Sequence, residues 1–369
     1  MTLAPSDFAQ ILRLPLDDVR ATVTQGDPTE RVWAAWALGL RLSPTAAGIL
    51  ADAARGEPDP GVRRHLAVVL TGLGEQGAVE ELAHSDPDAR VRATACRCLA
   101  LLARQIPRYA EMLGARVAAE EEIVKVAILE ALPTHLTDTV RTACVRLVGD
   151  VSLDVRQSVA ERLPEWLPPG AALPPLVLHQ AAIEPDRWLR RRLLGFCLAR
   201  DDVASVAVAV AASGASSCAI DLLDLLDASQ VSGWTDLAAL SGLGLRDVDR
   251  RLLALFAGRW DGVPLAWLLR CLEGLPSWQL LSVQVVRQLV SRLRAVAPSH
   301  LSPPDVARLS RLGDIAAQAL EEPPVVDYDL DEDEGGGWGS DEERDAYSSL
   351  VSTLVEEARR LQAASPSRG

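Results

Sequence analysis

Arginine and tryptophan side chains are concentrated between Arg187 and Arg192, where "RWLRRR" places four guanidinium groups around one indole. Guanidinium groups bind carboxylates and phosphates through paired hydrogen bonds, and an exposed indole offers a stacking surface. Tryptophan and arginine also dominate the few residues that carry most of the binding energy of protein interfaces. The sequence therefore predicts a partner-binding surface at Arg187, Trp188, Arg191, Arg192, Arg250 and Arg251.

The sequence contains none of the residue patterns that are typical of catalytic or metal-binding sites. The five histidines lie at 65, 84, 135, 179 and 300, and no two of them are within five residues of each other. The six cysteines, at 96, 98, 144, 197, 218 and 271, have none of the spacings of a zinc site. There is no glycine-rich phosphate-binding loop and no nucleophile elbow. We therefore predict a protein that is not an enzyme and holds no cofactor or metal.

A repeated pattern indicates the elements that must position these side chains. An aliphatic marker recurs with spacings of 30, 29, 33, 31 and 34 residues, at Val32, Val62, Val91, Val124, Val155 and Leu189. Such a period is typical of stacked helix pairs, because one pair cannot bury its apolar side alone. Alanine and leucine, which favour helices, dominate the composition. The sequence thus predicts an all-α fold, an α-solenoid of about eight to ten stacked helix pairs.

Charged residues keep the same phase as the marker. An acid precedes it by five residues at Asp27, Glu57, Asp86, Asp150 and Glu184. We expect each acid to cap the second helix of its pair, where a carboxylate accepts hydrogen bonds from unpaired N–H groups. The residue after the marker is basic at Arg63, Arg92, Lys125, Arg156 and Arg190.

This order of acid, aliphatic residue and base resembles HEAT repeats, in particular the short bacterial repeats of the bilin-lyase-like HEAT family, over about residues 16–320. In that family the acids and bases of successive repeats form a ladder between stacked helices. The resemblance implies a structural ladder of Asp27, Asp86, Arg92, Asp150, Arg156, Glu184 and Arg190, in which Asp86 pairs with Arg92 and Asp150 with Arg156. It also implies two interruptions, because Trp33 replaces a base and Ala119 replaces an acid. Under the alternative interpretation of "RWLRRR", Arg190 is only such a ladder base and its neighbours are solvated or paired.

Two stretches divide the chain. Five prolines between Leu163 and Leu176 predict an irregular connection at 164–176, between N-terminal HEAT-like repeats at 1–163 and C-terminal ones at 177–320. Residues 321–345 contain twelve acids and one arginine, which give −11 of the total net charge of −14. We therefore predict an acidic flexible tether at 321–340.

An amphipathic helix is predicted at 341–363, after the acidic tether. Ser340 and Glu343 have the spacing of a capping box. Apolar residues then follow helical spacing on one face, at Tyr347, Leu350, Leu354, Ala358 and Leu361. This helix either caps the last repeat, as solenoids require, or detaches to bind a partner.

These features favour a non-enzymatic HEAT-repeat scaffold or adaptor that mediates protein–protein interaction in the cytoplasm. The N-terminus has no basic region of a signal peptide, and the uncharged stretch 203–220 is too rich in alanine and serine for a membrane span. Lys125 is the only lysine beside 36 arginines, which suggests a bacterial source. The sequence gives neither the identity of the partner nor the oligomeric state.

Two alternatives remain open. The first is a nucleic-acid-binding or base-excision protein of the HEAT-like alkylpurine DNA glycosylase type, which Asp186 and Trp188 match by residue type alone. Against it, residues 1–320 have a net charge of −4, whereas nucleic-acid binders usually have a basic excess. The second is a bilin-lyase-like HEAT enzyme, suggested by kinship of the repeat, which does not fix chemistry.

Overall fold

Helices account for all the regular structure that the computed structural model describes, which covers residues 5–41, 44–226, 229–256, 262–273, 283–297, 301–321 and 341–364. Within these ranges there are 21 α-helices, three short 3₁₀ helices and no strand. The predicted all-α solenoid is therefore confirmed. The chain divides into two compact units, Met1–Gln180 and Ala181–Gly369.

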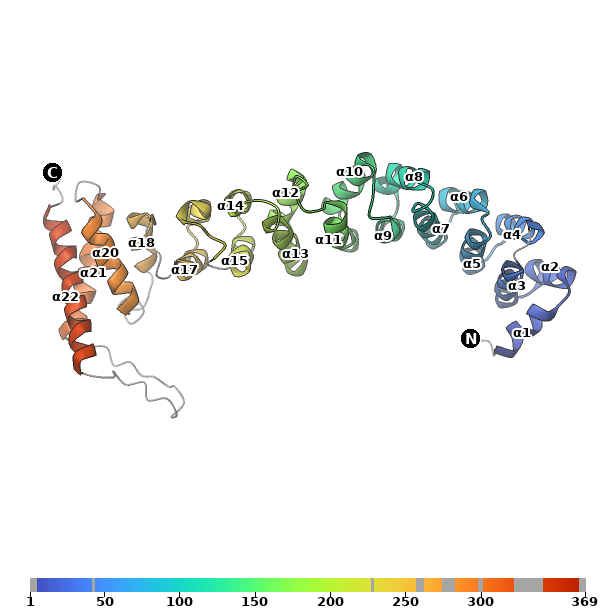
Figure 1. The fold of residues 1–369 in the computed structure, drawn as a ribbon. Helices are drawn as coiled ribbons and strands as arrows, with labels where there is room; N and C mark the ends of the chain where they lie inside the picture. The colour runs from blue at the N-terminus through green and yellow to red at the C-terminus, as the bar shows by residue number, and fades with distance from the viewer. Residues whose placement is uncertain are drawn as a thin grey trace. The chain divides into compact units, whose positions relative to one another are not determined.

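In unit 1, first and second helices alternate along the chain and form two layers (Figure 1). The first helices are α2 (Leu16–Gln25), α4 (Pro44–Gly56), α6 (Gln76–Ser85), α8 (Arg108–Arg116) and α10 (Asp138–Arg146). The second helices are α3 (Pro28–Leu40), α5 (Pro60–Gly72), α7 (Ala89–Leu102), α9 (Glu122–Ala131) and α11 (Leu153–Trp166). Helix α1 (Pro5–Arg13) packs against α3, and α12 (Pro175–Ile183) crosses the boundary between the units.

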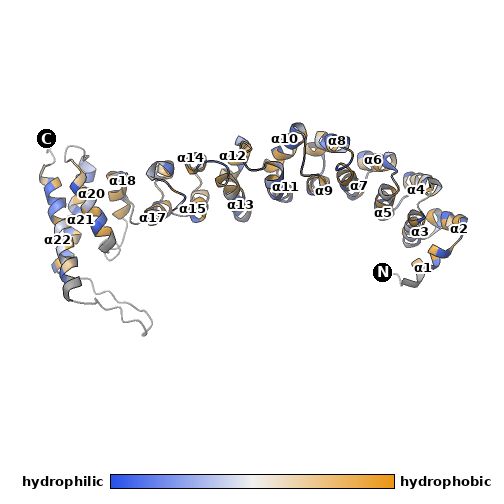
Figure 2. Cartoon of the chain, viewed as in Figure 1, coloured by the Kyte–Doolittle hydropathy of each residue, from blue (hydrophilic) through white to orange (hydrophobic). Residues whose placement is uncertain are grey.

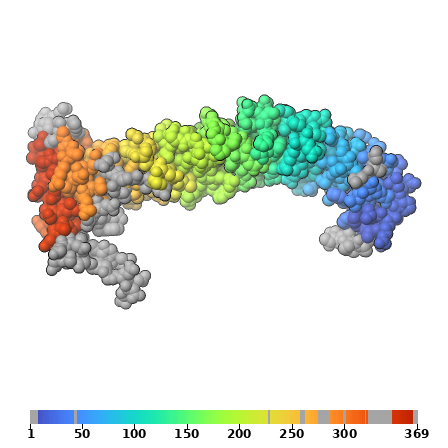
Figure 3. Space-filling model, in the orientation of Figure 1, coloured from blue at the N-terminus to red at the C-terminus, as the bar shows by residue number. Residues whose placement is uncertain are grey.

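The second helices of unit 1 pack in a continuous row, in which each of α3, α5, α7, α9 and α11 contacts the next. Helical spacing gives each of them an apolar stripe, and on α7 Val91, Ala95 and Leu99 are fully buried. Apolar residues occur along both layers (Figure 2), and the side chains fill the space between successive helix pairs (Figure 3). Close packing also depends on Gly114, because a Cβ there would lie 2.8 Å from Val140 Cγ1 on α10.

Side-chain caps fix where most second helices begin. Asp27 caps α3 in a capping box with Glu30, as the sequence predicts. The capping prediction is wrong for the four other acids, since the residue two positions later is the N-cap in each case. These caps are Asp59, Asp88, Ser152 and Asp186. The segments 57–59, 86–88 and 184–186 therefore belong to the connections before the helices.

Unit 2 continues with α13 (Arg187–Leu198), α14 (Val203–Ser213), α15 (Ser216–Leu225), α16 (Ala238–Ser241), α17 (Arg246–Leu255) and α18 (Leu265–Leu272). Three longer helices follow, α20 (Val283–Ala295), α21 (Pro303–Glu321) and α22 (Asp341–Ala364). Helix α22 packs against α20 and α21, and it buries Leu354, Ala358 and Leu361 of its predicted apolar face. Arg360 Nη2 donates to Leu293 O at 3.0 Å. These contacts give α22 the position of a terminal cap.

The connection between α11 and α12 is shorter than the 164–176 predicted from its prolines. Helix α11 continues through Pro164 to Trp166, and α12 begins at Pro175, so the irregular stretch is 167–174. Pro175 fits the first turn of a helix, where its missing N–H has no partner to lose. Most of the predicted acidic tether, residues 322–340, lies outside the described residues. No helix of the described part combines the length and the apolar character needed to cross a membrane.

Candidate functional site

A base occupies the same place in six successive second helices, four residues after the N-cap position. The bases are Arg31, Arg63, Arg92, Lys125, Arg156 and Arg190. From there a guanidinium reaches back to the connection before its own helix. Arg63 Nη1 donates to Glu57 O at 3.0 Å, and Arg92 Nη1 donates to Asp86 O at 2.8 Å. Each such bond satisfies a carbonyl group of the connection and fixes the direction of the arginine.

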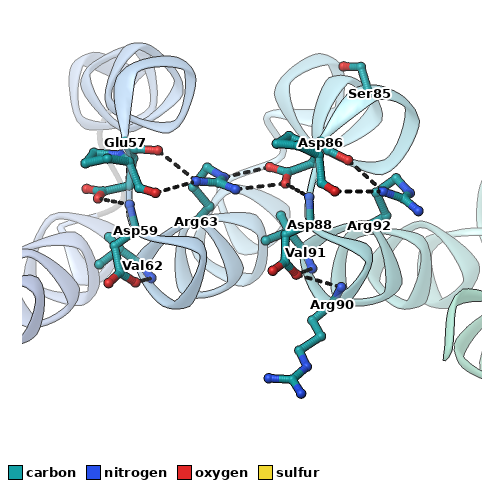
Figure 4. Close-up of polar contacts among 12 residues, drawn as sticks. Glu57, Asp59, Val62, Arg63, Ser85, Asp86, Asp88, Arg90, Val91 and Arg92 are labelled. Atoms are coloured by element: carbon teal, nitrogen blue, oxygen red, sulfur yellow. Dashed lines mark hydrogen bonds and ion pairs between the residues drawn. The ribbon is translucent and has the colours of Figure 1, made fainter.

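For Arg63, Arg92 and Lys125 the carboxylate partner comes from the following repeat, as Figure 4 shows for Arg63 and Asp86. Arg63 binds Asp86 in a bidentate pair, with Nε–Oδ2 and Nη2–Oδ1 distances of 2.7 and 3.0 Å. Arg92 binds Glu121 at 2.6 Å, and Lys125 Nζ binds Asp150 Oδ2 at 2.7 Å. Base and acid thus alternate along the stack, and each ion pair joins two repeats.

This geometry corrects the pairing that the family resemblance implied. Asp86 pairs with Arg63 of the preceding repeat, and Arg92 contacts only the backbone oxygens of Asp86 and Pro87 in that connection. The reason is local, because Asp86 Oδ1 also accepts the N–H of the cap residue Asp88 at 2.9 Å. The hydrogen bond from Asp88 thereby turns the carboxylate of Asp86 toward Arg63 on α5.

The second predicted pair is corrected in the same way. Asp150 accepts the N–H of Ser152 at 2.9 Å and binds Lys125, while Arg156 donates to Asp150 O at 3.0 Å. In unit 2, Glu184 accepts the N–H of Asp186 at 3.1 Å and is 1% exposed. The connections before α11 and α13 therefore repeat the arrangement around Asp86.

Both predicted interruptions of the ladder are wrong. Arg31, two residues before Trp33, stands four residues after the cap and binds Glu57 through two bonds of 2.8 Å. At the other place Glu121 supplies the carboxylate that Ala119 lacks. The predicted pattern places the first repeat two residues out of register, because Val32 follows its cap Asp27 by five residues whereas Val62 follows Asp59 by three. Asp27, predicted as a ladder acid, acts as a cap and forms no ion pair among the described residues.

Burial makes the ladder structural. Glu57 and Asp86 are 8% and 6% exposed. The hydrogen bond that Arg63 donates to Asp86 is the main cause of the raised pKa of Arg63. Burial by itself would raise the pKa of Asp150, but the hydrogen bonds from Lys125 and from the N–H of Ser152 lower it overall. The charges of these buried pairs are therefore neutralised within the stack.

In unit 2 the acid comes from the interior of a helix. Arg190 Nε donates to Asp221 Oδ2 of α15 at 2.7 Å, and Asp221 is 2% exposed. The same carboxylate has Arg187 Nε at 3.2 Å and Arg191 Nη1 at 3.5 Å. Arg251 of α17 binds the neighbouring Asp224 at 2.8 Å. Three arginines thus share one buried carboxylate, which leaves an excess of positive charge at the surface.

Trp188 lies beside this excess charge. It is 52% exposed, and the guanidinium of Arg192, one turn further along α13, lies 5.4 Å from the centre of its ring. We name Arg187, Trp188, Arg191, Arg192 and Arg251 the α13 surface. It contains five of the six predicted binding residues. Arg250 lines a separate cavity of about 310 Å³.

Among the tryptophans of the described residues, Trp188 is the only exposed one. Trp33 and Trp36 are half-buried, and Trp166, Trp234 and Trp267 are buried. Trp260, Trp278 and Trp338 lie outside the described residues. The sequence could not make this distinction, because an exposed position on a second helix is identified only after its cap is known.

The stacked pairs and the ladder between them define the class of protein, an α-solenoid of helical repeats. Residues 16–100 match the family model of HEAT repeats, and this segment spans α2 to α6 and most of α7. Within that segment the chain therefore consists of HEAT repeats. No curated protein matches it. The bilin-lyase-like subtype stays a prediction.

Proposed function

We propose that this protein is a non-enzymatic scaffold or adaptor of the bacterial cytoplasm, and that it binds another protein through the α13 surface. One observation carries the proposal: Trp188, the exposed tryptophan, lies among arginines that exceed the carboxylates they contact. Exposed tryptophan and arginine are the residue types most enriched in binding hot spots. HEAT repeats commonly serve as interaction scaffolds, which agrees with this use of the surface.

The chemistry favours a protein partner over nucleic acid. Asp221 and Asp224 pair with arginines of the α13 surface, and they neutralise part of the charge that phosphate contacts would use. Asp186, the residue that the glycosylase alternative needs as an acid, caps α13 by accepting the N–H of Leu189 at 2.8 Å. A protein face that offers one or two carboxylates and an apolar group complements Arg192 and Trp188 better than a phosphate backbone does.

Capture experiments test the proposal. The intact protein and its Trp188→Ala/Arg192→Ala variant would be used as bait in lysate of the native cell, with cross-linking and mass spectrometry. The matched control is Val208→Ala/Arg146→Ala, which removes an exposed apolar residue and an exposed arginine elsewhere. We expect a protein that the wild type and the control retain and the Trp188 variant loses. Retention by all three would refute the α13 surface, and a salt-dependent shift of DNA lost in the same variant would favour the nucleic-acid alternative.

A further inference from the structure

A groove opens on the solvent side of unit 1, between the second helices α7 and α9. Its volume is about 350 Å³. The floor consists of the small residues Ala93 and Ala127 together with Val126, and Ile123 forms one wall and is 44% exposed. Small side chains on both helices lower the surface between them. The groove is therefore an apolar depression parallel to two helices.

Arginines surround this apolar floor. Arg97 binds Glu130 at 2.6 Å at one end of the groove. Arg64 Nε donates to Thr94 Oγ1 at 3.3 Å, but within the described residues neither Arg64 nor Arg90 has a carboxylate partner. Two exposed guanidiniums without a counter-charge thus lie beside an apolar groove.

The same faces of α5 and α7 carry further exposed apolar residues. Val68 follows Arg64 by four residues, and Leu101 follows Arg97 by four, so each pair shares one helix face. Val68 and Leu101 are exposed although they are large and apolar. Positive and apolar side chains therefore alternate on the solvent side of two neighbouring helices. Arg64 and Arg90 are not bases of the ladder. The ladder base on α5 is Arg63, one position before Arg64, and the one on α7 is Arg92, two positions after Arg90.

We propose that this face binds an amphipathic helix of a partner protein, with leucine-like residues in the α7–α9 groove and acidic residues toward Arg64 and Arg90. The inference rests on the proposed scaffold function and adds a surface and the chemistry of its ligand. Helix α9, the shorter of the two, has 10 residues and is about 15 Å long, which provides room for nearly three turns of a ligand helix. Nucleic acid fits less well, because the groove floor is apolar and unit 1 has 23 acidic against 18 basic residues.

Binding of designed peptides to the full chain tests the proposal. The probe is a fluorescent helical peptide of about three turns, with leucines at helical spacing on one face and glutamates on the other. A second peptide has lysine in place of every glutamate. Fluorescence anisotropy would be measured for the wild type, Arg64→Glu/Arg90→Glu and Ile123→Ser. The matched control is Arg20→Glu/Arg146→Glu, which makes the same charge change on exposed residues of first helices.

We expect the acidic peptide to bind the wild type and the control equally well and the Arg64/Arg90 variant at least about tenfold more weakly. Ile123→Ser should also weaken binding, and the lysine peptide should not bind. Arg64→Ala/Arg90→Ala, with circular dichroism to check folding, keeps the test valid if the glutamate variant unfolds. Equal affinity for all variants, equal binding of the lysine peptide, or tighter binding of a single-stranded oligonucleotide would overturn the proposal. Loss of peptide binding in Trp188→Ala alone would also overturn it, while leaving the scaffold function intact.

Discussion

Replacing Asp86 with alanine should strongly destabilise the contact between α5 and α7. The carboxylate binds Arg63 through two hydrogen bonds and accepts the N–H of Asp88. Its side chain is 2% exposed and that of Arg63 is 11% exposed. The substitution therefore leaves a buried guanidinium without its counter-charge and a backbone N–H without its acceptor.

The magnitude follows from these contacts. Removing one partner of a buried ion pair costs about 3–5 kcal/mol, because the remaining charge stays out of water. Arg63 keeps the backbone oxygens of Glu57 and Pro58, which solvate part of that charge. We therefore expect a loss of about 2–4 kcal/mol for Asp86→Ala. Asp88→Ala, which removes the cap of α7, should cost about 1 kcal/mol.

Urea unfolding followed by circular dichroism gives the total loss, and hydrogen exchange of the α5 and α7 amides locates it. A local measurement is needed because solenoid stability is close to a sum over repeats and their interfaces. The control is Glu130→Ala, which breaks the half-exposed pair with Arg97 and should cost at most about 1 kcal/mol. In Arg63→Met/Asp86→Leu, where no charge is left unpaired, most of the stability should return.

Equal losses for Asp86→Ala and Glu130→Ala would refute the view that the ladder joins the repeats. A double variant as unstable as Asp86→Ala alone would show that the loss arises from packing and not from an unpaired charge. The coupling energy between Arg63 and Asp86, obtained from the double-mutant cycle, separates these explanations.

Three further predictions concern charge and thiols. The pKa of Asp150 is lowered in the folded state, so its ionised form stabilises the fold at pH values above its ordinary pKa of 3.8, and this stabilisation is lost as the pH falls through the lowered pKa of the folded state. In Asp150→Asn the midpoint of urea unfolding should therefore depend less on pH at the acid end. Burial raises the pKa of Cys96 and Cys144 to about 12, so both thiols should react with iodoacetamide at pH 8 only after unfolding, as mass spectrometry can show. Replacing the acids at 327, 329 and 331–334 by Ser/Gly should strengthen binding of an anionic partner at low salt, and this gain in affinity should shrink as salt is added. An affinity that is unchanged at every salt concentration would show that residues 321–340 act only as a spacer.

The sequence predicted the repeat because its signal is redundant. The base recurs in six successive second helices, each with an apolar stripe, so an error at one position does not remove the period. The first repeat shows the limit of this approach. Val32 resembled the aliphatic marker, and only the cap at Asp27 shows that Arg31 is the base equivalent to Arg63.

Side-chain direction could not be predicted in the same way. Asp86 and Asp88 both precede the helix, and both are acids able to cap it. Which one caps depends on where the chain enters the first turn, and the structure begins α7 at Ala89. The pairing of Asp86 with the preceding Arg63 depends on that choice as well. The residues of this contact could therefore be predicted from the sequence, but the partner of each residue could not.

Total charge is a poor guide to ligands in this kind of fold. The ladder takes acids as well as bases away from the surface, because pairs such as Arg63–Asp86 are buried between two repeats. A ligand responds to the charged residues that the ladder leaves at the surface, and these residues differ from one face of the molecule to another. On α13 three arginines share the carboxylate of Asp221, and on α5 and α7 the exposed Arg64 and Arg90 have no carboxylate partner in the part of the chain that the structure describes. Binding surfaces in such a stack are therefore best located by first assigning every base to its ladder acid, and then asking which bases remain.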